Sequence, residues 1–171
     1  LATFAMDVYG DDPCEEFIPK VSKDNPLDER SLTLTSQMHK AISVIQFKIE
    51  SLMISRHPLW KMDDRRLLNA IDYKKGTIKL DGKEYQMRSC NFPTIDPKHP
   101  DKLTEAEQAL IDRLHQSFTG SEKLRSHIRS LLRHGCMYNI FNHNLLFHAS
   151  IPLTEEGKLK EVEIEPGVKL K

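Results

Sequence analysis

The sequence predicts an α+β fold that is mainly helical and carries two small pairs of antiparallel strands. Apolar residues recur at steps of three and four over residues 33–56 and over 104–134, which is the spacing of amphipathic helices. An Asp-Gly dipeptide separates two short alternating runs within residues 77–87, and this pattern is typical of a β-hairpin. Two apolar runs flank an Asn-His-Asn turn within residues 137–151, where we expect the second antiparallel strand pair.

Composition excludes several classes of protein. The 171 residues suffice for one domain, and 25 basic side chains balance 25 acidic ones, which argues against a nucleic-acid partner. No apolar run is long enough to cross a membrane, and the start lacks the charged region of a secretion signal. The three cysteines lie far apart and outside any C-x-x-C pair, so we expect no disulfide framework or thiolate zinc site. We therefore predict a cytoplasmic protein without a membrane partner.

Residues 1–30 contain several turn dipeptides, among them Tyr9-Gly10 and Asn25-Pro26, so we expect an irregular arm. The arm is acidic. Because it has neither a D-x-D-x-D loop nor a histidine partner, a solvated acidic loop is favoured over a metal cluster. The carboxylates concerned are Asp7, Asp11, Asp12, Glu15 and Glu16.

The predicted helix over 33–56 is apolar on two sides. Phe47 and Ile54 fall opposite the main apolar stripe, and Val44 points toward that second side. Such a helix is sandwiched between layers of its own domain, or between the domain and a partner. His57-Pro58 ends it, because the residue before proline is disfavoured in helix. The main stripe comprises Leu34, Met38, Ile42, Ile45, Ile49 and Leu52.

Between the long helices we expect short elements. Asp63 and Asp64 begin a short helix that runs to about Ile71, since acidic residues suit a helix amino end. The Asp81-Gly82 dipeptide predicts a two-residue type I′ turn within the hairpin. Three prolines within residues 91–100 predict an extended loop.

The region 104–134 is expected to form an angled pair of helices. Thr104 and Glu107 form a capping box, Thr119-Gly120-Ser121 breaks the helix, and Gly135 ends the second helix. Their apolar residues are expected to face inward and cover a sheet or groove. These are Leu110, Ile111, Leu114, Phe118, Leu124, Ile128, Leu131 and Leu132.

The second helix of this pair also carries basic residues, namely Lys123, Arg125, Arg129 and Arg133. A solvated helix face is the favoured interpretation. Nucleic-acid binding has less support, because the face lacks interleaved aromatic residues.

His148 is the candidate site residue of this sequence. It directly follows the apolar run 145–147, which we interpret as a short buried strand, so the histidine lies at a strand's carboxyl end. Imidazoles in that position can bind metals or can serve as hydrogen-bonded structural groups. Known nucleophile and phosphate-loop motifs are absent. A single histidine cannot hold a catalytic metal, so its partners would have to come from elsewhere.

Several runs together resemble class III fructose-1,6-bisphosphatase, the manganese-dependent bacterial family, along nearly the whole chain. That family resembles the calcineurin-like metallophosphoesterases. The runs are Leu1-Ala2-Thr3-Phe4-Ala5-Met6, Asp12-Pro13-Cys14, Met38-His39-Lys40-Ala41-Ile42, Ile45-Gln46-Phe47-Lys48, Met62-Asp63-Asp64-Arg65, Gly76-Thr77-Ile78, Phe92-Pro93-Thr94-Ile95-Asp96-Pro97, Leu103-Thr104-Glu105 and Asn144-Leu145-Leu146-Phe147-His148.

The resemblance implies a hydrolase of gluconeogenesis that removes the 1-phosphate of fructose 1,6-bisphosphate. Two divalent metals, manganese being the implied cofactor, would polarise the phosphate and lower the pKa of a bound water. His148 corresponds to a metal-binding histidine of that family, which usually has glycine where this chain has Ala149. The family's D-x-H, G-D-x-x-D-R and G-N-H-D/E motifs are absent, so we expect an internal segment that is inactive alone and binds no metal.

The resemblance also suggests a division of the chain. Residues 1–30 would be the arm, 31–135 a helical insertion with the β-hairpin, and 136–171 strands of the metallophosphatase core. The expected partners are the sugar bisphosphate and the rest of the enzyme, or a second copy through helix 33–56. The alternative function is a non-catalytic interaction or regulatory module, in which this helix docks a catalytic core or a partner subunit.

Overall fold

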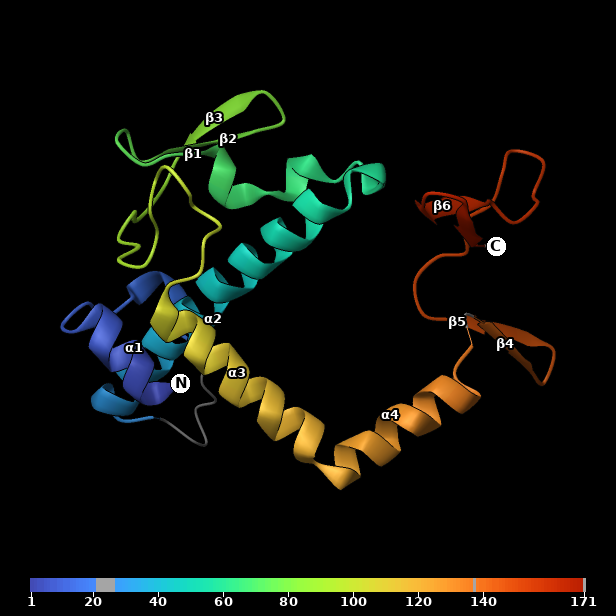
Figure 1. The fold of residues 1–171 in the computed structure, drawn as a ribbon, viewed down its shortest axis with the longest axis horizontal. Coiled ribbons are helices and arrows are strands. Elements are labelled where there is room, and N and C mark those ends of the chain that lie inside the picture. Colours follow the sequence, from blue (N-terminus) through green and yellow to red (C-terminus); the bar gives the residue numbers. More distant parts are fainter. Residues whose placement is uncertain (21–26, 137, 171) are drawn as a thin grey trace. The chain divides into compact units, whose positions relative to one another are not determined.

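The computed structural model describes residues 1–20, 27–136 and 138–170, which fall into two units. The N-terminal unit comprises Leu1–Asp112 and the C-terminal unit Arg113–Lys171 (Figure 1). Helices and small antiparallel sheets occur in the chain, so the α+β class is confirmed. Within the described ranges, every helix is too short or too polar to cross a membrane.

Helix α2 (Glu29–Arg56) is the longest element of the N-terminal unit. It begins four residues before the predicted start, because the side chain of Asp28 accepts a hydrogen bond from the Ser31 backbone N–H at 2.9 Å and so satisfies a free donor of the first turn. The helix ends before His57-Pro58, as the sequence predicts.

Helix α1 (Ala2–Tyr9) corrects the expectation of an irregular arm over residues 1–30. Its residues Phe4, Ala5 and Tyr9 are buried, and the helix packs against α2. The first turn residues end this helix rather than prevent it. Gly10, which follows Tyr9, has a φ of 54°, a value that glycine adopts without strain. A 3₁₀ helix, η1 (Glu15–Phe17), follows. The expected Asn25-Pro26 turn lies outside the described residues.

The segment after α2 forms short 3₁₀ helices in place of the single helix expected over 63–71. These are η2 (Pro58–Trp60), η3 (Asp63–Arg65) and η4 (Leu67–Ala70). Arg66 separates the last two, since its ψ of 67° lies outside the helical range. The sequence therefore predicted helical structure in this segment, but it did not predict the break at Arg66.

The predicted hairpin is confirmed as strands β2 (Thr77–Leu80) and β3 (Lys83–Gln86), with Ile78 opposite Tyr85. Asp81 and Gly82 both have positive φ, 48° and 77°, as a type I′ turn requires. The two-residue strand β1 (Ile71–Asp72) extends the sheet to the antiparallel order β1-β2-β3.

The core of the N-terminal unit lies between α2 and the segments that follow it. Val44, Leu68 and Ile95 form a buried cluster. Four partly buried side chains pack around it, namely Phe47, Ile71, Tyr73 and Phe92. The second apolar side of α2 is therefore covered within this chain, and Ile54 on the same side is only 4% exposed.

Helices α3 (Glu105–Gly120) and α4 (Glu122–His134) confirm the helix pair and its capping box. The Thr104 N–H donates to the Glu107 carboxylate at 2.7 Å, and the Glu107 N–H donates to the Thr104 hydroxyl at 3.2 Å. Ser121 caps α4 by accepting from the Leu124 N–H at 3.3 Å.

The expected inward orientation of this pair holds for Leu110, which is buried, but it is wrong for most of α4. Leu131 is 70% and Leu132 81% exposed, and Phe118 and Ile128 are exposed as well. The physical reason is that the described residues of the C-terminal unit supply no sheet or groove over these side chains.

The C-terminal unit contains two hairpins. Strands β4 (Tyr138–Phe141) and β5 (Asn144–Phe147) confirm the predicted strand pair, while β6 (Val162–Glu165) pairs with β7 (Val168–Leu170). The expectation of a buried strand at 145–147 is wrong, because each of these side chains is at least half exposed. An isolated two-stranded hairpin has no second layer to bury them.

Candidate functional site

His148 directly follows strand β5, at the carboxyl end where the sequence places it. The preceding turn has positive φ at both Asn142 (49°) and His143 (60°), which matches the twist of a tight hairpin. The His148 side chain is exposed, and within the described residues it is not held by a structural hydrogen bond. Its ring nitrogens are therefore accessible to a ligand.

The residues around His148 do not fit a metal ion in this chain. Among the described residues, no group of three histidine, cysteine or carboxylate side chains could hold a cation. A catalytic metal requires at least three protein ligands in most sites of this kind. The described residues alone therefore do not form a complete catalytic metal site.

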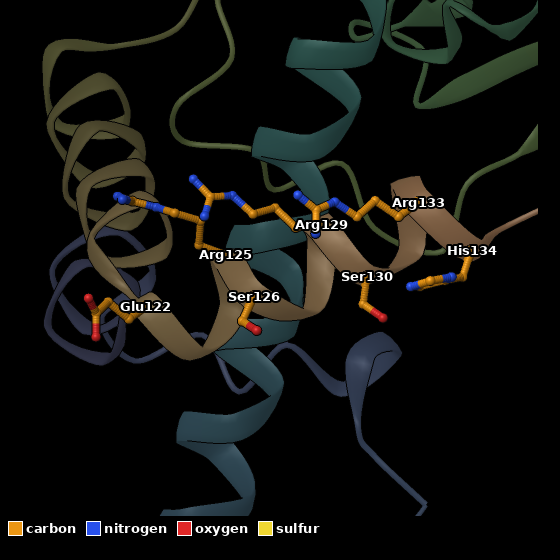
Figure 2. A pocket seen from close by; sticks show the side chains of 7 residues that line it. All are labelled: Glu122, Arg125, Ser126, Arg129, Ser130, Arg133 and His134. Carbon is orange, nitrogen blue, oxygen red and sulfur yellow. The ribbon is translucent and has the colours of Figure 1, made fainter.

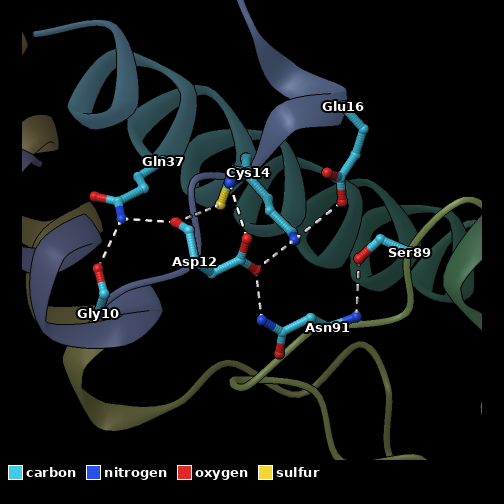
Figure 3. Close-up of polar contacts among 8 residues, drawn as sticks. Gly10, Asp12, Cys14, Glu16, Gln37, Ser89 and Asn91 are labelled. Carbon is cyan, nitrogen blue, oxygen red and sulfur yellow. Dashed lines mark hydrogen bonds and ion pairs between the residues drawn. The ribbon is translucent and has the colours of Figure 1, made fainter. Parts of the chain in front are cut away.

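A cluster of polar side chains joins Lys40 of α2 to Asp12 and Glu16; Figure 3 shows these two carboxylates with Gln37 and Asn91. The Lys40 ammonium is fully buried and lies 3.4 Å from Asp12 and 3.2 Å from Glu16. It also lies over the rings of Tyr9 and Phe92, 5.2 and 5.7 Å from their centroids. Charge and cation–π contacts together hold this ammonium in place.

Further hydrogen bonds join the Lys40 cluster to two loops. The Gln37 amide donates to the carbonyls of Gly10 and Asp12, at 2.9 and 2.8 Å, and the Asn91 amide donates to the Asp12 carboxylate. Every buried polar side-chain atom of the described residues has a hydrogen-bond partner. The cluster therefore fastens segments 10–16 and 89–91 to α2.

The pKa shifts of this cluster agree with a structural role. Burial raises the pKa of Asp12, but the Cys14 N–H, the Asn91 amide and the Lys40 ammonium outweigh it and hold the pKa below its ordinary value. Burial also raises the pKa of the Cys14 thiol to about 11. A thiol with that pKa is protonated at neutral pH and is a poor nucleophile.

A second buried lysine on α2 pairs with the capping residue of α3. Lys48 lies 2.8 Å from the Glu107 carboxylate and donates to the Thr94 carbonyl at 2.6 Å; both charged side chains are buried. Glu107 thus has two roles, since it caps α3 and also neutralises the charge of Lys48. One helical turn further, Ser51 contacts Asp101 at 3.2 Å, and Arg66 contacts both.

The α4 surface carries a row of basic side chains. Arg125, Arg129 and Arg133 line one open depression of about 580 Å³, and Figure 2 shows their guanidinium groups along one edge of the helix. The remaining lining residues, all from α4, are Glu122, Ser126, Ser130 and His134.

The sequence predicted His148 at a strand end and the basic residues on a solvated helix face, but it did not predict the two buried lysines of α2. The signal was present, because Gln37, Lys40, Lys48 and Ser51 recur at helical spacing on one face. An apolar stripe on a neighbouring face concealed it. A polar stripe becomes a buried face only when carboxylates elsewhere in the chain neutralise it.

Comparison with known families accounts for nearly the whole chain. The family profile described as Firmicute fructose-1,6-bisphosphatase matches residues 1–170. The chain belongs to this family. The resemblance found in the sequence is therefore confirmed at the family level.

Curated relatives support the assignment to this family. The chain is 54% identical over 165 residues to the fructose-1,6-bisphosphatase class 3 of Clostridium botulinum (strain Alaska E43 / Type E3), covering 96% of the chain. It is 52% identical over 165 residues to the class 3 enzyme of Parabacteroides distasonis and 53% identical over 166 residues to that of Clostridium novyi (strain NT), again covering 96% of the chain. The chain spans about a quarter of these relatives, 25% in each case. No solved structure matches.

Proposed function

We propose that this chain is part of a cytoplasmic fructose-1,6-bisphosphatase that hydrolyses the 1-phosphate of fructose 1,6-bisphosphate. The observation that carries the proposal is the family match along residues 1–170. The names of the curated relatives support the substrate, since each is a fructose-1,6-bisphosphatase of class 3. The activity belongs to the longer enzyme, and we expect the 171-residue chain alone to show no turnover.

In this proposal, His148 supplies one ligand of a dinuclear divalent-metal site, with manganese as the metal. Its support is local: an exposed imidazole at the end of β5, free of structural hydrogen bonds within the described residues. A neutral imidazole is a common metal ligand. Similarity to the calcineurin-like metallophosphoesterases is part of the same proposal.

We further propose that residues 31–135 form an insertion and that 136–171 belong to the metallophosphatase core. The large apolar side chains exposed in the C-terminal unit support a cover supplied by the rest of the enzyme. Contiguous exposed apolar surface is typical of a contact site. The residues concerned include Ile140, Phe141, Leu145, Leu146 and Phe147.

The proposal is tested in the longer enzyme with His148→Asn and, as a matched control, His143→Asn. Both histidines are exposed, but His143 lies in the turn at positive φ, where asparagine is well tolerated. We expect His148→Asn to lower manganese binding, measured by calorimetry, and turnover by at least about 10- to 100-fold, the range seen when only an outer-shell partner of a metal ligand is lost. The control is expected to change neither quantity.

Unchanged manganese affinity in His148→Asn, with normal helicity by circular dichroism, would remove this histidine from the metal site. The proposed hydrolase activity has a separate test. If the longer enzyme does not hydrolyse fructose 1,6-bisphosphate in the presence of manganese, the proposal is contradicted, independently of the result for His148. Turnover by the 171-residue chain alone would contradict the expectation that this segment is inactive.

A docking role for helix α2 is the second candidate function, and it has less support. The second apolar side of the helix suggests such a role. That side is covered within the chain, however, because Ile54 is buried and Phe47 packs on the core cluster. The apolar residues of α2 that remain exposed include Ile49 and Met53. Self-association through them predicts a dimer by analytical ultracentrifugation that Met53→Glu converts to a monomer.

A further inference from the structure

One face of α4 carries an apolar stripe that the described residues leave largely uncovered. Successive residues of an α-helix are about 100° apart, so the four apolar side chains of this face fall within roughly 100° of the helix circumference, the width of a face that packs against a partner. Leu131 is 70% and Leu132 81% exposed, so little of their apolar area is removed from water. The stripe comprises Leu124, Ile128, Leu131 and Leu132.

The stripe continues into an apolar groove where α3 meets α4. The groove is an open hollow of about 350 Å³, and both helices contribute to its mainly apolar lining. A concave apolar groove accepts the side chains that project from a folded segment, as in the helix-in-groove mode of recognition. A lipid surface instead receives the convex apolar face of a helix that lies on it, so the groove favours a polypeptide partner. The lining residues are Phe118, Thr119, Leu124, Arg125, Ile128 and Arg129.

Arginines flank the stripe along one edge. Arg125, Arg129 and Arg133 are spaced by four residues, and Figure 2 shows their guanidinium groups along one edge of the helix. Among the described residues, no ion pair involves any of the three. The Arg125 side chain donates a hydrogen bond to the Thr119 carbonyl at 2.9 Å. Like charges four residues apart destabilise a helix, so carboxylates on a partner would relieve the repulsion within this row.

A second copy of α4 fits the stripe poorly because of its charge. Four basic side chains and a single carboxylate, that of Glu122, lie within residues 122–134. In a two-fold antiparallel pair the same edges of the two helices meet, so the two arginine rows would lie together. A parallel pair would place each row against the edge that carries Lys123 and no carboxylate. Like charges opposite each other disfavour both pairings.

We propose that the α3–α4 groove and the apolar stripe dock a helical segment of the same enzyme polypeptide, from outside residues 1–171, whose apolar face is flanked by Asp or Glu side chains. The chain spans 25% of each curated relative, so the longer enzyme has ample length to supply this segment. A covalently linked segment docks at a high effective concentration, which favours it over a separate protein. Of the proposed function, only the existence of the longer enzyme is assumed here; neither hydrolysis nor His148 is involved.

The contact is tested by photo-cross-linking of the purified longer enzyme in which benzoylphenylalanine replaces Ile128. We expect a cross-link within one polypeptide, which runs near the monomer mass on a denaturing gel. Mass spectrometry should identify a captured peptide from outside residues 1–171, with apolar residues at helical spacing beside Asp or Glu. The same label at Lys123, which lies off the stripe and outside the groove lining, should not capture that peptide.

Hydrogen exchange tests the contribution of the charges. We expect the amides of α4 to exchange more slowly in the longer enzyme than in the 171-residue chain, because docking suppresses local opening. Arg129→Glu should speed this exchange in the longer enzyme by about tenfold, the effect of one charge-assisted contact. Lys123→Glu, the matched control, should change it less than about twofold. Circular dichroism checks that each variant keeps its helix, which is expected because glutamate is a good helix former.

Several results would overturn the proposal. These are the absence of a captured peptide, a product of twice the monomer mass, a captured peptide from within residues 1–171, and equal effects of the two glutamate variants. Protection of the α4 amides only after vesicles of phosphatidylglycerol are added would overturn it as well, and would assign α4 to a membrane surface. All these measurements are made without turnover, so their outcome is separate from that of the hydrolysis assay on the longer enzyme.

Discussion

The two units of the chain differ in which side chains they bury and which they expose. In Leu1–Asp112, charged groups such as Lys40, Lys48 and Glu107 are fully buried, and each has an oppositely charged partner. In Arg113–Lys171, large apolar side chains such as Leu132 are exposed, while the α4 arginines have no ion-pair partner among the described residues. The buried charges of the first unit are therefore paired, whereas the arginines and many large apolar side chains of the second unit are uncovered.

This difference teaches where the stability of the isolated chain resides. Buried groups that are paired within Leu1–Asp112 lose their partners only when that unit unfolds. Exposed apolar groups of the other unit contribute little in the absence of a covering surface, because hydrophobic stabilisation scales with the area removed from water. Substitutions in the two units should therefore have effects of very different size.

The largest effect is expected for Lys48→Met, which leaves the Glu107 carboxylate buried without its ammonium partner. Removing one member of a buried pair costs about 3–5 kcal/mol. The free energy of unfolding is measured by urea titration with the fluorescence of Trp60. This residue is the single tryptophan of the chain and lies in the N-terminal unit, so its fluorescence reports on the unfolding of that unit.

The control for this prediction is Lys98→Met, at an exposed lysine, and we expect it to leave the stability unchanged. The double variant Lys48→Met/Glu107→Gln should recover much of the loss, since glutamine removes the unpaired charge and still fits a capping box. If the double variant is as unstable as Lys48→Met, the loss does not arise from an uncompensated carboxylate.

A smaller effect, about 1–3 kcal/mol at neutral pH, is expected for Lys40→Met, because water partly screens its carboxylate partners. This cluster also predicts a pH dependence. Burial raises the pKa of Asp12 and Glu16, but hydrogen bonds and Lys40 hold both below their ordinary values. Their contribution is complete above the unfolded values of about 4 and is lost as the pH falls through the folded values.

The wild-type chain should therefore lose stability as the pH falls below the unfolded values of about 4, and Lys40→Met should flatten this slope. Urea titrations of Trp60 fluorescence at a series of pH values measure both curves. Lys75→Met breaks an exposed pair with Asp72, whose pKa is lowered first by the backbone N–H groups of Lys75 and Lys74, so it should change the slope less than Lys40→Met. Parallel acid slopes in wild type and Lys40→Met would show that Lys40 does not hold the two carboxylates ionised.

The sequence predicted the elements whose signals are local. The Asp81-Gly82 turn and the Thr104–Glu107 capping box each depend on residues within a few positions, and the structure contains both. The break at Arg66 and the two-residue strand β1 have no comparable signal, because each depends on packing against α2 or on pairing with β2. Local sequence signals therefore predicted the elements but not all of their boundaries.

Burial was less predictable than secondary structure, because it depends on what covers a residue. Lys48 is buried because Glu107, 59 positions away, neutralises it. Leu146 is exposed although its sequence is that of a buried strand. For the candidate site, the position of His148 at a strand end could be predicted, whereas its role as a metal ligand stays a prediction because the described residues bring no other ligands to it.

The smallest effect is expected for Leu132→Ser, because this side chain is 81% exposed. Substitutions at such positions usually change the free energy of unfolding by less than about 0.5 kcal/mol. Leu68→Ala in the core cluster, where the leucine is 3% exposed, should instead cost about 2–5 kcal/mol. Urea titration measured by far-ultraviolet circular dichroism, which follows both units, compares the two variants. A loss of several kcal/mol in Leu132→Ser would mean that α4 is packed within this chain, and the contrast between the two units would then fail.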